Sequence, residues 1–179
     1  SVDKIKTISK LKQETEDVLD FRLKSYETFK NMPMPSFGPK LDIDFNNITY
    51  YKRINDKVFN NWESVRCDVK NTFDSVGLID AENKYLGGVG AQYDSETVYH
   101  NMLDDIKKAG IIFTDTDTAL REYPELFKKY FNNLVNYKEN KFTALNGCVW
   151  SGGSFIYVPK NTKLDRPLQS YFRINTKDM

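Results

Sequence analysis

Cysteine and histidine, the residues that most often carry metal or covalent chemistry, are almost absent from this sequence. It has two cysteines and one histidine in 179 residues. Cys67 and Cys148 have neither the spacing of a zinc motif nor that of a disulfide framework. His100 has no cysteine or serine near it in an arrangement typical of a catalytic triad. We therefore predict no catalytic, metal-binding or cofactor-binding residues, no enzymatic activity, and reduced thiols, as is usual in the cytoplasm.

Long apolar runs and a one-sided charge are also missing. The longest apolar runs, such as residues 155–158, are far shorter than the roughly 20 residues that cross a bilayer. Twenty-six basic and 25 acidic residues leave a net charge of +1, so no overall field attracts nucleic acid or an anionic membrane. Residues 87–90 contain glycines but lack the third glycine or the lysine of phosphate-binding loops, and we interpret them as a turn. We expect neither nucleic acid nor a membrane as a partner.

Charge is nevertheless uneven along the chain. Residues 74–105 carry seven acidic side chains and one lysine. We interpret this stretch as a solvated acidic face, with a docking face for a basic partner as the alternative. Residues 151–179 are more basic and contain interleaved aromatics, but the alternation predicts that Phe172 points inward with Leu168, which argues against a nucleic-acid stacking surface.

A folded core is expected, because 40% of the residues are hydrophobic and 14% are aromatic. Residues 3–31 read as a helix in two pieces, with Thr15 capping the second and Arg22 facing elsewhere or snorkelling. Prolines make residues 32–39 a connector. Apolar spacing and caps predict further helices at 68–76, 95–109, from Pro124 to 131 and at 140–150, with an extended segment at 97–99 and a cap at Asn101 as the alternative within 95–109. Runs rich in β-forming residues predict strands at 111–113, 154–158 and 168–174.

The pattern changes at Gly152 and Gly153. Short strands separated by Pro and Asn turns follow, and they read as rungs of a coil that cannot bury their inner face without neighbours. An open strand edge near residues 168–174 would allow self-association. We predict an α+β chain with a helical arm and proline connector at 1–39, a mixed α+β domain at 40–150 and the start of a β-helix (β-solenoid), truncated, at 151–179.

Ordered strings along nearly the whole chain resemble the SufB family, the scaffold subunits of the SUF system of iron–sulfur cluster assembly. The related SufD subunits are less similar to them. The most specific strings are NKFTALN at 140–146, VWSGGSFIYVP at 149–159 and PLQSYFRIN at 167–175, preceded by LDFRLK at 19–24, MPMP at 32–35 and GVGAQYDSE at 88–96.

This resemblance implies a scaffold that works with a SufC-like ATPase and a SufD-like subunit, and a right-handed parallel β-helix after the N-terminal domain. It also implies that this chain is an N-terminal fragment, since family members are much longer. The cluster ligands and the ATPase-docking helices would lie beyond Met179, and neither Cys67 nor Cys148 matches a functional cysteine of the family. Two alternatives stay open: an interaction module without chemistry, and a β-solenoid enzyme that acts on polysaccharide.

Overall fold

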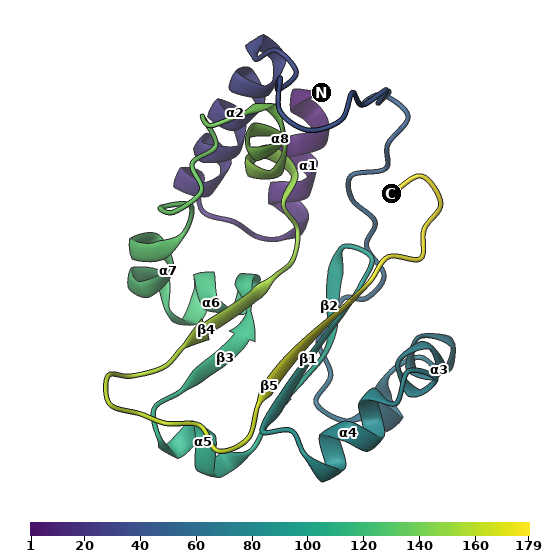
Figure 1. The fold of residues 1–179 in the computed structure, drawn as a ribbon, viewed down its shortest axis with the longest axis vertical. Helices are drawn as coiled ribbons and strands as arrows, with labels where there is room; N and C mark the ends of the chain where they lie inside the picture. The colour runs from purple at the N-terminus through teal and green to yellow at the C-terminus, as the bar shows by residue number, and fades with distance from the viewer. The chain divides into compact units, whose positions relative to one another are not determined.

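The computed structural model describes residues 1–179 and has the α+β composition expected (Figure 1). Its residues form two compact units. Unit 1 contains residues 1–51, 123–151 and 178, and unit 2 contains residues 52–122, 152–177 and 179. Each unit is therefore built from stretches that are separated in sequence. The domain boundaries predicted after residues 39 and 150 stay a prediction.

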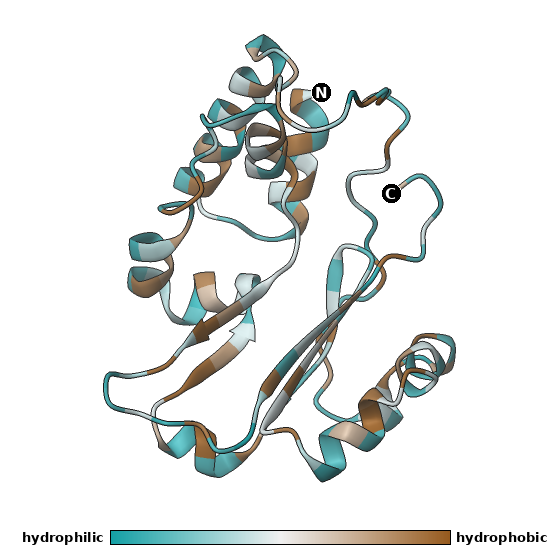
Figure 2. Ribbon diagram, viewed as in Figure 1, coloured by the Kyte–Doolittle hydropathy of each residue, from teal (hydrophilic) through white to brown (hydrophobic).

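Unit 1 is helical. Its helices are α1 (Val2–Leu11), α2 (Glu16–Asn31), α7 (Pro124–Tyr130) and α8 (Lys141–Val149). The two-piece helix predicted over residues 3–31 is confirmed, with Thr15 at the N-cap of α2. Figure 2 shows hydrophilic and hydrophobic residues mixed along α1 and α2, as expected for helices that bury one face.

Helix α8 lies directly against α2 (Figure 1). It begins in a capping box, in which the Asn140 side chain accepts the backbone N–H groups of Phe142 and Thr143. Glycine at 147 allows the close approach, because a Cβ there would lie 2.6 Å from the hydroxyl oxygen of buried Ser25. The contact between the two helices thus depends on small residues at its centre.

Unit 2 contains two small sheets. Strands β1 (Gly88–Tyr93) and β2 (Glu96–Met102) form an antiparallel hairpin, and β5 (Leu168–Arg173) pairs in parallel with the other edge of β1. The second sheet joins β3 (Ile112–Asp115) antiparallel to β4 (Ser154–Tyr157). Figure 1 shows the long segment of chain that separates β4 from β5.

Helices close the core of unit 2. Helices α3 (Cys67–Asp74) and α4 (Leu78–Lys84) contribute Val69, Phe73 and Leu78 to a cluster with the buried face of β1. The short 3-10 helix Trp62–Ser64 adds Trp62 to this cluster. Helices α5 (Asp104–Lys108) and α6 (Thr116–Glu122) flank β3 in sequence. No helix of the structure combines the length and the apolar character that crossing a membrane requires.

The predicted β-helix is wrong. The strands at 154–158 and 168–174 exist, but they do not stack as rungs, since β4 pairs antiparallel with β3 and β5 pairs parallel with β1. The predicted inward face is also wrong, because Phe172 is 54% exposed while Tyr171 packs edge-on against Phe73 at 5.8 Å. Strand partners come from distant parts of the chain, which the local spacing of turns does not encode.

Two other predictions are wrong for local reasons. Residues 95–109 form β2 and α5 and not one helix, and residues 87–90 are not a turn, because Gly88 and Gly90 belong to β1. A Cβ on Gly88 would lie 3.1 Å from the Phe113 ring. These glycines therefore allow β3 to approach the sheet closely.

Candidate functional site

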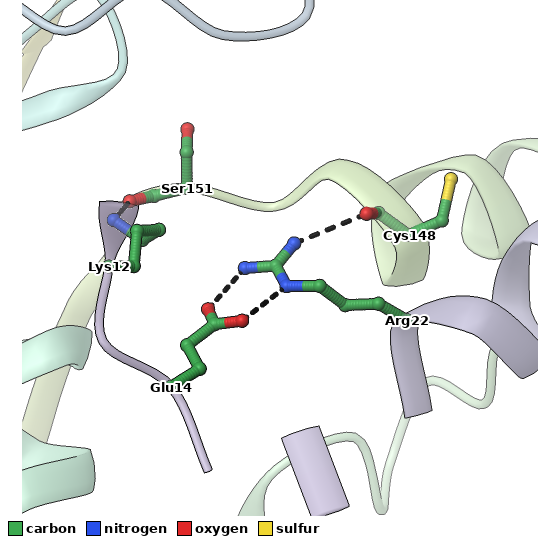
Figure 3. A network of polar contacts seen from close by, with 5 residues as sticks. All are labelled: Lys12, Glu14, Arg22, Cys148 and Ser151. Carbon is green, nitrogen blue, oxygen red and sulfur yellow. Dashed lines mark hydrogen bonds and ion pairs between the residues drawn. The ribbon is translucent and has the colours of Figure 1, made fainter. Parts of the chain in front are cut away.

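The most unusual polar residue of unit 1 is Arg22, which has no solvent-exposed surface. Its guanidinium binds the Glu14 carboxylate through two nitrogens, with an Nε–Oε2 distance of 2.7 Å (Figure 3). The Glu14 side chain is equally inaccessible. The third nitrogen, Nη1, donates to the backbone carbonyl of Cys148 at 3.2 Å. The prediction that Arg22 faces elsewhere or snorkels is therefore wrong, because it forms a buried, bidentate ion pair.

This ion pair lies at the C-terminal end of α8. The Arg22 guanidinium is 4.5 Å from the centre of the Trp150 ring, and the Lys12 ammonium donates to the carbonyl of Ser151 (Figure 3). The last carbonyls of a helix have no partner within the helix and carry partial negative charge. Arg22 of α2 satisfies one of these carbonyls, and Lys12 at the end of α1 binds the chain just beyond α8, so the two cations join α1, α2 and α8.

Cys148 contributes only its backbone to this cluster. Its sulfur points away from Arg22 in Figure 3 and donates to the carbonyl of Leu145 at 3.1 Å. Burial raises the pKa of the Cys148 thiol to about 11, although the nearby Arg22 charge acts in the opposite direction. The thiol therefore stays protonated near neutral pH, and protonated thiols are poor nucleophiles and poor metal ligands.

In unit 2, the buried charged residue that joins distant segments of the chain is Asp94. It occupies the turn between β1 and β2 with a φ of +51° and is 4% exposed. Its carboxylate accepts the backbone N–H groups of Asn175 at 2.7 Å and Thr176 at 2.9 Å, and the Thr176 hydroxyl at 2.6 Å. Burial alone would raise the pKa of Asp94, but these hydrogen bonds outweigh it and lower the pKa below its ordinary value. The carboxylate fixes the chain after β5 to the β1–β2 turn.

A second carboxylate of unit 2, Glu82 of α4, accepts three side-chain donors. They are the Trp62 indole at 2.6 Å, the Tyr99 hydroxyl at 2.6 Å and the Asn101 amide at 3.0 Å. The Tyr99 ring stacks on Trp62 with centroids 3.8 Å apart. Burial, reinforced by the hydrogen bond to Glu82, raises the pKa of Tyr99. The group holds α4 on β2, and the Glu82 carboxylate is engaged by three donors of the same chain.

The acidic residues of the stretch 74–105 do not act together. Asp94 and Glu82 are used in the contacts above, whereas Asp80 forms a surface ion pair with Lys84 at 2.8 Å. Asp104 does the same with Lys107 at 3.2 Å. The predicted acidic face is therefore divided between internal anchors and surface pairs.

The cysteines and the histidine are not assembled into a reactive group. Cys67 is exposed on α3, and Cys148 belongs to the other unit. His100 contacts the Phe113 ring at 4.9 Å between centroids, and burial lowers the pKa of its imidazole. Within residues 1–179, no three or more His, Cys, Asp or Glu side chains are placed to hold a metal ion. The predicted absence of catalytic and ligand residues stays a prediction.

An iron–sulfur cluster, the cargo that the resemblance implies, does not fit this donor set. Such clusters are bound mainly by cysteine thiolates, usually four of them. This chain offers the exposed Cys67 and the buried, protonated Cys148, one in each unit. No step of cluster chemistry is therefore assigned to residues of this chain.

The fold and these contacts define a chain whose polar residues are used for architecture. Residues 9–170 match the family model described as the SufBD protein N-terminal region. Iron–sulfur cluster assembly SufBD family proteins of Staphylococcus haemolyticus and Staphylococcus aureus strain USA300 are each 55% identical to it over 176 residues. Each match covers 98% of this chain and 38% of the relative. The chain belongs to the SufBD family and spans well under half the length of these relatives, so the family expected from the sequence is confirmed at this level.

The strings that carry the resemblance meet in space within each unit. Residues 19–24 and 149–159 meet where Arg22 lies over Trp150. Residues 88–96 and 167–175 meet along the β1–β5 pair and at the Asp94 carboxylate. Sequence reasoning missed Arg22 and Asp94 as anchors. The available signals were an arginine in helical register with Val18 and the small Ser25, and an aspartate at a hairpin turn.

Proposed function

We propose that this chain is the N-terminal part of a SufB-type scaffold on which iron–sulfur clusters are assembled in the cytoplasm. The observation that carries the proposal is the ordered series of SufB-like strings along a chain that is 55% identical to curated cluster-assembly proteins. In this role the cluster is the cargo. A SufC-like ATPase and a SufD-like subunit are the proposed partners, bound through parts of the longer protein outside these 179 residues.

Within that scaffold, the proposed role of this segment is architectural and not enzymatic. The support is the use of its charged groups, since buried Arg22 and Asp94 and partly buried Glu82 are hydrogen-bonded to other groups of the same chain. The protonated Cys148 thiol agrees with this role. The β-solenoid enzyme considered as an alternative loses its basis together with the β-helix.

Anaerobic reconstitution with iron and sulfide tests this proposal. The 179-residue chain should show no stable sulfur-to-iron charge-transfer absorbance, and Cys67→Ser and Cys148→Ser should not change that result. The full-length Staphylococcus aureus relative, incubated alone, should acquire a cluster. A stoichiometric cluster on the 179-residue chain, or a full-length protein that needs a second subunit to form one, would contradict the proposal.

One surface favours the second candidate, an interaction module. In the segment after α7, Leu134 is 96% exposed and Val135 is 58% exposed. Adjacent exposed apolar side chains are typical of contact sites. Lys129 and Lys138 lie on either side of this pair in sequence, whereas Lys128 pairs with Asp17 at 3.1 Å, so the partner that fits is an apolar surface bordered by acidic residues. In this second function the partner binds this segment directly, so the immobilised 179-residue chain should retain a peptide whose apolar side chains are bordered by acidic ones. The double change Leu134→Ser with Val135→Ser should reduce that retention, whereas Val76→Ser, a comparably exposed valine of unit 2, should not.

Self-association through β5 stays part of the proposal. Strand β5 is at the edge of its sheet, and Phe172 and Ile174 are exposed there. Sedimentation velocity should show dimers of the 179-residue chain that Ser170→Pro abolishes, because proline removes a backbone donor from the edge. A strict monomer at high concentration would contradict this part.

A further inference from the structure

Unit 1 contains a cavity of about 730 Å³ that no contact described so far uses. It lies between α1, the C-terminal half of α2, the irregular segment 45–51 and α8. The buried side chains of Ile5, Ile8 and Cys148 form its apolar base. We name it the α1–α8 pocket. Its volume lies within the roughly 300–1,000 Å³ typical of sites for small organic molecules.

Aromatic rings make up much of the wall of the α1–α8 pocket. Phe29 and Phe45 meet edge to face with centroids 5.2 Å apart, and this contact joins α2 to the segment 45–51. The ring-bearing residues of the lining are Tyr26, Phe29, Phe45, Tyr50 and Tyr51. Rings of this kind present flat apolar surfaces on which another ring stacks favourably.

The polar groups of the lining point to an uncharged occupant. The hydroxyl of Tyr50 donates to the carbonyl of Phe45 at 2.8 Å and is thereby satisfied within the chain. Burial raises the pKa of both Tyr50 and Cys148, so both stay neutral near pH 7. The charged groups of the lining are the carboxylate of Asp3, the ammonium of Lys4 and the α-amino group of Ser1, and all three belong to exposed residues. A charged ligand would lose its hydration here without finding an opposite charge inside.

Cations already lie over three of the rings. The ammonium of Lys141 is 4.6 Å from the centre of Phe29, that of Lys30 is 5.3 Å from Tyr26, and that of Lys12 is 6.0 Å from Tyr51. None of these lysines lines the pocket. These ammonium groups nevertheless place positive charge within about 6 Å of rings that line the pocket, and that charge repels a second cation. The rings therefore favour an apolar ligand over a cationic one.

We propose that the α1–α8 pocket binds an uncharged, ring-bearing apolar small molecule, in a role that neither the SufBD family assignment nor the proposed scaffold function includes.

Fluorescence titration with N-phenyl-1-naphthylamine, an uncharged naphthalene probe, tests the proposal on the 179-residue chain. We expect saturable binding of one probe per chain. Val149→Trp on α8 and Thr49→Trp in the segment 45–51 place a large ring in the pocket and should weaken binding at least tenfold. Val76→Trp is the matched control in unit 2 and should leave binding unchanged. The anionic probe 8-anilinonaphthalene-1-sulfonate should bind at least tenfold more weakly.

A second readout locates the probe. Cys148 lines the pocket and Cys67 does not, so bound probe should slow the alkylation of Cys148 at least threefold and leave that of Cys67 unchanged. Thermal melts establish that each variant is folded, and Thr49→Trp, which lies outside every helix, keeps the test valid if Val149→Trp unfolds. The proposal is overturned by unsaturable binding, by folded pocket variants that bind like Val76→Trp, or by equal affinity for the sulfonate.

Discussion

Each of the two units uses a buried charged side chain to join segments that are distant in sequence, but the sign of the charge and its partners differ. In unit 1 a buried cation, Arg22, joins the end of α8 to the α1–α2 connection, and its charge is neutralised by Glu14. In unit 2 a buried anion, Asp94, joins the chain after β5 to a hairpin turn; its hydrogen-bond donors are neutral, and the charge of Lys52 acts on it without a hydrogen bond. An ion pair deprived of one partner leaves a second charge buried, whereas neutral donors that lose a carboxylate can turn to water. Replacing Arg22 should therefore lower the free energy of unfolding more than replacing Asp94.

The largest effect is expected for Arg22→Met. This change leaves the Glu14 carboxylate buried without its partner and removes the donor to the Cys148 carbonyl. Breaking a buried pair in this way typically costs about 3–5 kcal/mol of the free energy of unfolding. Urea denaturation followed by circular dichroism measures the loss.

The control for Arg22→Met is the double change Arg22→Met with Glu14→Gln. It removes both charges, so it should recover at least half of the lost stability. A double variant as unstable as the single one would show that packing around Arg22, and not the unpaired carboxylate, carries the effect.

A smaller effect is expected for Asp94→Asn. Asparagine tolerates the positive φ of this position, but it offers a weaker acceptor to the Asn175 and Thr176 amides. Losing hydrogen bonds to a charged group should cost about 1.5–3 kcal/mol in urea denaturation. Amide exchange at residues 175 and 176 should accelerate before the rest of unit 2 is affected. Asp165→Asn is the control, because that side chain is 89% exposed, and equal losses in both variants would refute the anchor role.

The smallest effect is a dependence of stability on pH that comes from unit 2. Burial lowers the pKa of His100 below its ordinary 6.5, so the unfolded chain binds a proton at a higher pH than the native chain does. The contribution of neutral His100 to the free energy of unfolding is therefore fully present above pH 6.5, and it is lost as the pH falls toward the pKa of His100 in the folded chain. Asp94, with its lowered pKa, adds a second loss only below its ordinary value of 3.8.

Because His100 is the only histidine, His100→Gln should remove the difference in unfolding free energy between about pH 7.5 and about pH 5.5. Arg22→Met should retain that difference, since it alters unit 1. A slope that persists in His100→Gln would assign it to another group.

Local signals predicted the helices of unit 1 well. Asn140 and Pro124 lie at the beginnings of α8 and α7, where cap chemistry and a fixed φ favour helix formation. These features depend on residues within one or two turns of each other, and the sequence contains them in full.

Features that depend on distant residues were not predictable in the same way. Val98, Met102 and Ile106 have the spacing of one face of a helix, yet Val98 and Met102 lie in strand β2. The pairing of β1 with β2 shifts by one residue between Ala91 and Gln92. At this bulge the consecutive residues Val98 and Tyr99 are both buried, so β2 lacks the alternating burial that would have identified it as a strand. From the sequence alone Arg22 is expected at the surface, because its partners, Glu14 and the end of α8, are brought to it only by the tertiary fold. The anchors of both units arise from tertiary contacts and not from a motif.

The parallel pairing of β5 with β1 has a consequence for synthesis of the chain. The β1–β2 hairpin leaves the ribosome early, but the residues of β5 follow their partners in β1 by 80 residues, and Asn175 follows Asp94 by 81. Helix α8 of unit 1 is translated in between. Because long-range pairing must wait for the later segment, the sheet of unit 2 is completed last, after every helix of unit 1 has been made.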